Sequence, residues 1–246
     1  MGEAIKSWDN LKQEIDMAEE AGRFLPLWWR DDDAIQKTPA LSRLYTYRVP
    51  LVLAVIPALL KQDLPMISGI KIAQHGYDHH NRASQGEKKN EFPLDRNEDE
   101  IIQTLQEGRK ILTHTFGHDF LPLFVPPWNR FSHSHLLWQK AGLKRISAYS
   151  NPLIPQQPGG EPYRLDTHID LINWHKRSFI GEKAVLDGLC AHLRQKRSGL
   201  ADRLQPTGFL SHHLVHDRET WSFLDKWTNF LENEKNRIGW ILPEID

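Results

Sequence analysis

Residues 74–81, QHGYDHHN, place three histidines and one aspartate within six consecutive positions. His75 and His79 are four residues apart, so both imidazole rings can reach one ion from a single turn of chain. Joined by a carboxylate from another segment, they would form a ligand set that leaves coordination positions open for water or substrate. Such a set is typical of a catalytic metal ion, whereas the alternative is an exposed loop that happens to be rich in histidine. Asp78 and His80 are candidates for orienting the two ligands, and the alternative is that both are simply exposed.

Three consecutive aspartates, Asp31, Asp32 and Asp33, follow an apolar run. Neighbouring carboxylates repel one another, and the end of a strand tolerates them better when a cation is close. A solvated acidic run or a helix cap is the alternative interpretation. If strand alternation continues through this segment, Arg30 and Asp32 share one face, and the aspartates on either side of Asp32 share the other.

Two further segments carry groups that suit hydrolysis. In FVPPWNR, residues 124–130, two prolines fix the backbone before Trp128, whose N–H could then donate to a developing oxyanion. A rigid turn with a buried tryptophan is the alternative. The segment GFLSHHLVHD, residues 208–217, contains three histidines. Because neighbouring residues of a strand point to opposite faces, at most one of His212 and His213 can reach the same site.

The elements that would position these groups follow from short apolar runs that alternate with helical patterns. Alternating strands and helices favour a parallel sheet, and seven or eight strands in one domain favour a (β/α) barrel. A doubly wound sheet, the competing fold, normally begins with a glycine-rich turn that is missing here. We therefore predict one α/β barrel domain over residues 1–246. The expected strands are residues 24–29, 50–56, 70–74, 120–125, 145–149, 168–172, 208–211 and 238–242, and the expected helices are residues 5–20, 98–113, 133–141, 182–196 and 218–233.

All of the polar segments described above follow expected strands. The aspartate run follows the first strand, the histidine cluster the third, the proline turn the fourth and His212 the seventh. The carboxyl ends of parallel strands meet at one face of a barrel, and barrel enzymes carry their active sites on that face. We therefore expect these residues to form one site. Two loops are also expected, residues 81–100, which end at a helix capped by Asn97, and residues 151–162, which are rich in proline and glycine.

The overall composition restricts the class of protein. The 31 basic and 32 acidic residues nearly cancel, so neither nucleic acid nor an anionic membrane is indicated as a partner. The single cysteine, Cys190, excludes an internal disulfide. The first 20 residues lack the apolar core of a signal peptide, and no apolar run reaches the length of a membrane span. We expect a cytoplasmic protein, and the sequence does not indicate its oligomeric state.

In their order along the chain, these segments resemble the motifs of the polysaccharide deacetylase (NodB-homology) family, which are metal-dependent carbohydrate esterases. DDA at residues 32–34 matches the Asp-Asp motif, HGYDH at residues 75–79 matches His-Ser/Thr-x-x-His, and VPPW at residues 125–128 matches Arg-x-Pro-Tyr. DLINW at residues 170–174 matches Asp-x-x-Asp-Trp, and LSH at residues 210–212 matches Leu-x-His. Each motif is short, but five in family order cover most of the chain.

The resemblance implies a distorted (β/α) barrel of about seven parallel strands. It also implies a hydrolase that removes acetyl groups, N- or O-linked, from a carbohydrate. By position, Asp33, His75 and His79 would bind one divalent metal ion. Zn²⁺ is expected first, with Co²⁺, Mn²⁺ or Ni²⁺ as alternatives.

The catalytic roles follow from the same resemblance. Asp32 would be the base that activates the attacking water, and His212 would be the acid that protonates the departing amine. The backbone N–H of Trp128 would hold the oxyanion, and Asp170 would complete the catalytic set. A shift by one residue would instead make Asp31 the base and Asp32 the metal ligand.

This sequence departs from the family pattern at several positions. Val125 stands where the family has the arginine that steadies the base. Arg30, two residues before Asp32, is the expected substitute, and Arg130 is the next candidate. Asn173 replaces the second aspartate of the fourth motif. Two alternatives therefore stay open, a catalytically impaired barrel that binds sugar or regulates, and a metal amidohydrolase that acts on a non-sugar amide.

Overall fold

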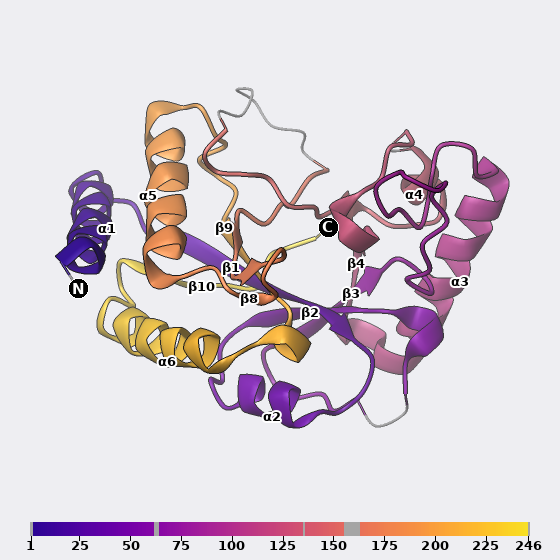
Figure 1. The fold of residues 1–246 in the computed structure, drawn as a ribbon, viewed down its shortest axis with the longest axis horizontal. Helices are drawn as coiled ribbons and strands as arrows, with labels where there is room; N and C mark the ends of the chain where they lie inside the picture. Colours follow the sequence, from indigo (N-terminus) through magenta and orange to yellow (C-terminus); the bar gives the residue numbers. More distant parts are fainter. Residues whose placement is uncertain (1, 62–63, 135, 155–162, 246) are drawn as a thin grey trace.

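The computed structural model describes residues 2–61, 64–134, 136–154 and 163–245. Its centre is a layer of strands with helices packed around it (Figure 1). Seven of the strands are β1 (Leu25–Ala34), β2 (Leu51–Val55), β3 (Ile70–His75), β4 (Phe120–Val125), β5 (Arg145–Ile146), β6 (Ile169–Asp170) and β9 (Thr207–Ser211). They follow the spatial order β5-β4-β3-β2-β1-β9-β6, and every pairing among them is parallel. The expected α/β fold with about seven parallel strands is confirmed.

The outer strand β5 is linked to β9 through the segment that leads into β6. On one side, the Leu165 N–H donates to the Ile146 carbonyl of β5 at 2.9 Å. On the other side, the His168 N–H donates to the Gly208 carbonyl of β9 at 2.7 Å. Backbone hydrogen bonds therefore continue from strand to strand on this side as well. Because each strand pairing here spans only a few residues and is irregular, the barrel is distorted.

The strand β1 has three neighbours. Its amino half pairs with β10 (Ile238–Trp240), and its carboxyl half pairs with β2 from Arg30 onward. The strand β9 borders β1 from Leu27 to Asp31. The pairing with β2 shifts in register between Asp31 and Ala34, which marks an irregularity of the bulge type. The strand that carries the three aspartates is thus fixed on both sides up to the point where they begin.

The described part of the chain forms the α-helices α1 (Gly2–Glu20), α2 (Pro39–Tyr45), α3 (Glu98–Phe116), α4 (Leu136–Lys140), α5 (Glu182–Ser198) and α6 (Arg218–Asn233). All but α2 coincide with expected helices. The seven residues of α2 are too few to show a helical period in the sequence. This helix begins at Thr38, whose side chain accepts the Leu41 N–H at 2.9 Å, and Pro39 follows. The predicted start of α3 is confirmed, since Asn97 accepts the Glu100 N–H at 3.1 Å.

The helices cover the sheet on its outside, and a small apolar group fills its inner face. The helices α1 and α5 pack together at one edge of the layer, and α3 and α4 at the other (Figure 1). The inner group consists of Trp28, Val52, Ala54, Ala73, Leu123, Val125 and Leu165, all of them buried. Because side chains alternate along β1, Arg30 and Asp32 follow Trp28 on this face. The apolar inner face therefore ends in charged groups at the carboxyl ends of the strands.

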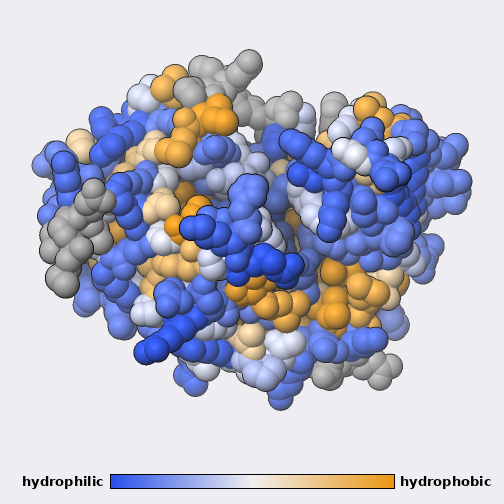
Figure 2. Space-filling model, viewed as in Figure 1, coloured by the Kyte–Doolittle hydropathy of each residue, from blue (hydrophilic) through white to orange (hydrophobic). Residues whose placement is uncertain are grey.

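On the face shown in Figure 2, hydrophilic residues cover most of the surface and apolar residues appear in separate patches. Within the described ranges, no helix combines the length and the apolar character that crossing a membrane requires. In the loop expected at residues 81–100, residues 81–97 contain neither helix nor strand, and residues 98–100 already belong to α3. Of the proline-rich segment, residues 151–154 form a turn, and residues 155–162 lie outside the described residues.

Candidate metal centre and active site

The carboxyl ends of β1 and β3 bring one carboxylate and two imidazoles together. His75 is the last residue of β3, His79 lies in the turn that follows, and Asp33 lies at the end of β1. One ligand atom from each residue lies within 4.8 Å of the other two. The Oδ1 atom of Asp33 is 3.2 Å from the Nε2 atom of His75 and 3.5 Å from the Nε2 atom of His79. The expected candidate ligands therefore converge on one point.

These three side chains fit a divalent metal ion. Asp33 Oδ1 is buried and has no hydrogen-bond partner among the described residues. The Nδ1 atom of His75 lies 3.0 Å from the Val125 carbonyl oxygen. Because a carbonyl can only accept, Nδ1 carries the proton of a neutral ring, and Nε2 is left free to act as a ligand. Two imidazole nitrogens and one carboxylate oxygen form a donor set that suits zinc and leaves coordination positions open.

The charges at this centre shift the pKa values of its members. Burial acts to raise the pKa of Asp33, but His75, His212 and His79 together hold it well below its usual value. Burial acts to lower the pKa of His75, but Asp32 and Asp33 outweigh it, and the net shift is upward. The pKa of His79 is lowered, first by burial and then by the neighbouring His75. The carboxylates thus create a site that attracts positive charge.

Several residues around the centre adopt the left-handed backbone conformation. The φ angle is 69° at Asp33 and 56° at His79, Trp128 and Asn129. Such conformations cost on the order of 1–3 kcal/mol each outside glycine, and they gather at functional sites. At Asp33, the positive φ coincides with the irregular pairing at the end of β1, and the side chain turns toward the histidines. The expectation that Asp31 and Asp33 share a face is therefore wrong.

Asp31 belongs to a separate buried network. Its Oδ2 atom accepts a hydrogen bond from the Ser211 hydroxyl at 2.5 Å and one from the His213 N–H at 3.0 Å. Its Oδ1 atom lies 2.5 Å from His213 Nδ1. The Trp29 indole N–H donates to the same Ser211 hydroxyl at 2.8 Å. With both oxygens engaged, Asp31 is not placed to act as a metal ligand, and His213 points away from the side on which His212 lies, as alternation predicted.

Asp32 is held by Arg30 through two hydrogen bonds. The Arg30 Nε and Nη2 atoms donate to the two carboxylate oxygens at 2.8 and 3.0 Å. The guanidinium is fully buried and also donates to the Ser147 hydroxyl at 2.6 Å and to the Asn129 side-chain oxygen at 2.9 Å. Arg130, the next candidate, instead donates to a backbone carbonyl of the neighbouring loop at 2.8 Å. The predicted pairing of Arg30 with Asp32 is therefore present.

His212 follows β9 and faces Asp32, with 3.9 Å between its Nε2 atom and Asp32 Oδ2. Its Nδ1 atom is buried without a hydrogen-bond partner among the described residues. The Trp174 ring meets the His212 ring edge-on, with 4.5 Å between centroids, and its indole N–H donates to Asp170 at 2.8 Å. Burial raises the pKa of Asp170. Asp170 thus accepts a hydrogen bond from Trp174, and the charge of His212 acts against the effect of burial on the Asp170 pKa.

The predicted proline turn is present at the end of β4. Residues Pro127–Asn129 form a short 3₁₀ turn, and Trp128 is only partly buried. The Trp128 ring packs against the His79 ring, with 4.4 Å between centroids. The alternative interpretation, a tryptophan buried in the core, is therefore wrong. Oxyanion binding by the Trp128 N–H stays a prediction.

Three residues that support this site were not identified from the sequence. Asn129 and Ser147 bind Arg30, and the Glu91 carboxylate accepts hydrogen bonds from the backbone N–H groups of residues 77–79. Burial raises the pKa of Glu91 to about 7. The resembled family has serine or threonine at the position of Gly76. This glycine is the one feature of the sequence which indicates that another residue holds the turn at residues 77–79.

No protein-family model matches this sequence, and no curated protein matches it. Solved structures do match. A family 4 carbohydrate esterase from Streptomyces lividans, in complex with acetate, is 13% identical with a TM-score of 0.53, over 90% of this chain and 98% of that one. A peptidoglycan N-acetylglucosamine deacetylase is 16% identical with a TM-score of 0.53, over 88% and 86%. A CE4 esterase from Streptococcus mutans is 14% identical with a TM-score of 0.51, over 94% and 90%.

These similarities extend over nearly the whole chain. At such low identity they establish the fold, which this chain shares with carbohydrate deacetylases and esterases of family 4. The distorted barrel that the sequence motifs implied is thus confirmed.

Proposed function

We propose that this protein is a metal-dependent hydrolase that removes acetyl groups, N- or O-linked, from a carbohydrate. The observation that carries the proposal is the convergence of a ligand set, Asp33, His75 and His79, with Asp32 and His212 at the carboxyl ends of the barrel strands. The shared fold supports the same activity, since the solved proteins with this fold include a peptidoglycan N-acetylglucosamine deacetylase and an esterase in complex with acetate.

In this proposal, Asp33, His75 and His79 hold one divalent ion, with Zn²⁺ as the first expectation and Co²⁺, Mn²⁺ or Ni²⁺ as alternatives. Two imidazoles and one carboxylate leave open positions for water and substrate. When bound, the ion supplies Lewis acidity, which makes water a better nucleophile and an acetyl carbonyl a better electrophile near neutral pH.

Asp32 is proposed as the general base. Because Arg30 holds both of its oxygens at 2.8 and 3.0 Å, the carboxylate has one fixed orientation beside the ligand set. A carboxylate fixed in this way can accept a proton from an attacking water. Arg30 makes this contact from within β1, so the missing arginine at Val125 does not leave Asp32 without a guanidinium partner. For this reason we favour an active enzyme over a catalytically impaired barrel.

His212 is proposed as the general acid, and Trp128 as the oxyanion donor. The Nε2 atom of His212 lies 3.9 Å from Asp32, so the base and acid candidates border the same small region. Protonation by His212 matters most for an amide, because an amine is a poor leaving group without a proton. Trp174, which is 46% exposed, places its ring beside His212 and offers an apolar face to an acetyl group or a sugar.

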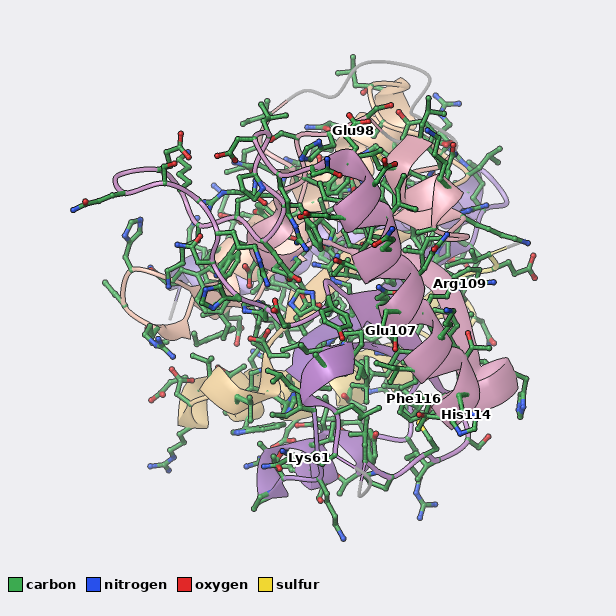
Figure 3. All side chains as sticks on the ribbon, turned by 90° about the vertical axis from the view of Figure 1, so that its right-hand side faces the viewer. Lys61, Glu98, Glu107, Arg109, His114 and Phe116 are labelled. Atoms are coloured by element: carbon green, nitrogen blue, oxygen red, sulfur yellow. The ribbon has the colours of Figure 1, made fainter. Side chains whose placement is uncertain are left out.

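An acetate-release assay over small N-acetyl and O-acetyl sugars tests the proposal. The purified protein should release acetate, chelation should abolish the release, and added Zn²⁺ or Co²⁺ should restore it. His79→Ala should lose most of the bound metal and of the activity, because it removes one of three ligands. His114→Ala is the matched control, since His114 is exposed at the far end of α3 from Glu98 (Figure 3).

Two outcomes would contradict this assignment in different ways. Equal metal content in His79→Ala and the unmodified protein would show that the histidine cluster is only a polar loop. If the protein binds metal normally but hydrolyses only non-sugar amides, it is a metal amidohydrolase and not a carbohydrate deacetylase.

A further inference from the structure

Glu91 lies in the loop between β3 and α3, and its side chain is fully buried. Its Oε1 atom accepts the N–H of Tyr77 at 2.9 Å and the N–H of Asp78 at 3.2 Å. Its Oε2 atom accepts the N–H of His79 at 3.2 Å. Three consecutive backbone N–H groups thus surround one carboxylate, an arrangement in which the backbone forms an anion-binding concavity. The turn that Glu91 holds is the one that carries the candidate ligand His79.

Gly76 allows this carboxylate to approach the turn. Its φ angle is 56°, and a Cβ atom added there would collide with the Oε2 atom of Glu91 and lie 2.6 Å from the Cγ atom of Pro127. A serine or threonine, which the resembled family has at this position, would therefore not fit beside Glu91. The glycine and the buried glutamate form one arrangement, in which the Glu91 carboxylate fills the space of the missing side chain.

Glu91 is itself held firmly in place. The Asn90 side-chain oxygen accepts the Phe92 N–H at 2.9 Å, so the chain bends tightly around Glu91. The buried Phe92 ring packs edge-on against Phe124 of β4, with 5.8 Å between centroids. On the other side, the Arg96 guanidinium donates to the Glu91 carbonyl at 3.3 Å. The carboxylate is therefore backed by the core, so the turn is supported from a fixed point.

We propose that Glu91 is a positioning residue for the metal centre, which holds the turn at residues 77–79 so that the Nε2 atom of His79 stays beside Asp33 and His75. The inference rests on the proposed metal site and adds a residue that contacts none of the three ligand atoms. His79 has a left-handed backbone, which a chain adopts only when its surroundings impose it. Without the three hydrogen bonds to Glu91, the turn should relax and the ligand set should lose its geometry.

A Co²⁺ titration of the full-length protein tests this role, because the visible absorption of bound Co²⁺ reports affinity and coordination geometry together. Glu91→Gln keeps the shape of the side chain but replaces one acceptor oxygen by an amide group that cannot accept an N–H. Its dissociation constant for Co²⁺ should rise about 10–100-fold, the usual range for the loss of a group that orients a metal ligand. The absorption bands should also change, and the melting temperature of the metal-free protein, measured in parallel, separates a general loss of stability from a loss of ligand geometry.

Glu87→Gln is the matched control, since it removes the same charge from an exposed position in the same loop. It should leave the Co²⁺ affinity and spectrum unchanged. Glu91→Asp keeps the charge but shortens the reach by one methylene group, so it should also weaken binding, and it carries the test if Glu91→Gln does not fold.

The outcomes separate this inference from the proposed function. Failure of the unmodified protein to bind Co²⁺ would overturn the metal site itself and the role of Glu91 with it. Co²⁺ binding that is strong and equal in the unmodified protein and the Glu91 variants would overturn only the positioning role. An equal loss of affinity in Glu87→Gln would likewise overturn it, because the effect would then come from the charge of the loop.

Discussion

The three consecutive aspartates have three different surroundings. Asp31 is hydrogen-bonded to Ser211 and His213 in a buried network, Asp32 is held by Arg30, and Asp33 faces the two candidate ligand imidazoles. Each carboxylate thus has its own partner, which offsets the repulsion between neighbouring negative charges. The left-handed backbone at Asp33 makes this division possible, because a regular strand would return Asp33 to the side of Asp31.

At the residue scale, Asp32→Asn should bind metal normally and lose turnover by roughly 10²–10⁴-fold, the usual effect of removing an acid–base group. Asp33→Asn should instead lose the metal, because it removes a ligand. Elemental analysis of the two variants, together with kcat on an acetylated substrate, checks both statements. If Asp32→Asn empties the site and Asp33→Asn does not, the register is shifted by one residue, with Asp32 as the metal ligand and Asp31 as the base.

At the scale of elements, the features that could be predicted are those that depend on residues close together in the sequence. The two histidines lie four residues apart beside one strand end, and the strands themselves are short apolar runs, so neither requires knowledge of distant contacts. The helix α2 was missed because seven residues show no period. The support from Glu91 was missed because it depends on the path of an irregular loop, which has no repeating pattern.

The start of α3 gives a test of one element alone. Asn97→Ala should lower the free energy of unfolding by about 1 kcal/mol, because the Glu100 N–H loses its acceptor at the first turn of the helix. Urea denaturation measures this change. Gln103→Ala, at an exposed position within the same helix, is the control and should not destabilise the protein. A decrease of the same size in both variants would argue against the capping role.

At the scale of the whole molecule, two buried histidines lie outside the candidate site, between α5 and β9. The rings of His168 and His192 stack with 3.7 Å between centroids. The His168 Nδ1 atom accepts the Gly208 N–H at 3.0 Å, and the His192 Nδ1 atom lies 3.0 Å from the Thr207 hydroxyl. Burial lowers the pKa of both rings, with that of His192 falling to about 3. Both rings are therefore neutral in the folded protein near neutral pH.

This pair should make the fold sensitive to acid. The pKa of His192 in the folded protein lies below its unfolded value of about 6.5. Its contribution to stability is therefore fully present above pH 6.5 and is lost as the pH falls from there toward 3, by up to about 1.4 kcal/mol per pH unit. Urea denaturation between about pH 7.5 and 5, with chelator present, should show a shallower decrease for His192→Gln than for the unmodified protein. Equal slopes would show that His192 does not contribute.

The pairing of β1 also has a consequence for the order in which the protein is made. The three candidate ligands all lie within the first 79 residues, but β1 acquires its neighbour β9 only after residue 211 has been synthesised. At about 5–20 residues per second, the ribosome needs on the order of ten seconds for the intervening chain. Throughout that time Asp33 belongs to a strand with one side unpaired, and pairing across so long a separation is slow. We therefore expect the metal to be acquired only after β9 has been synthesised and has paired with β1.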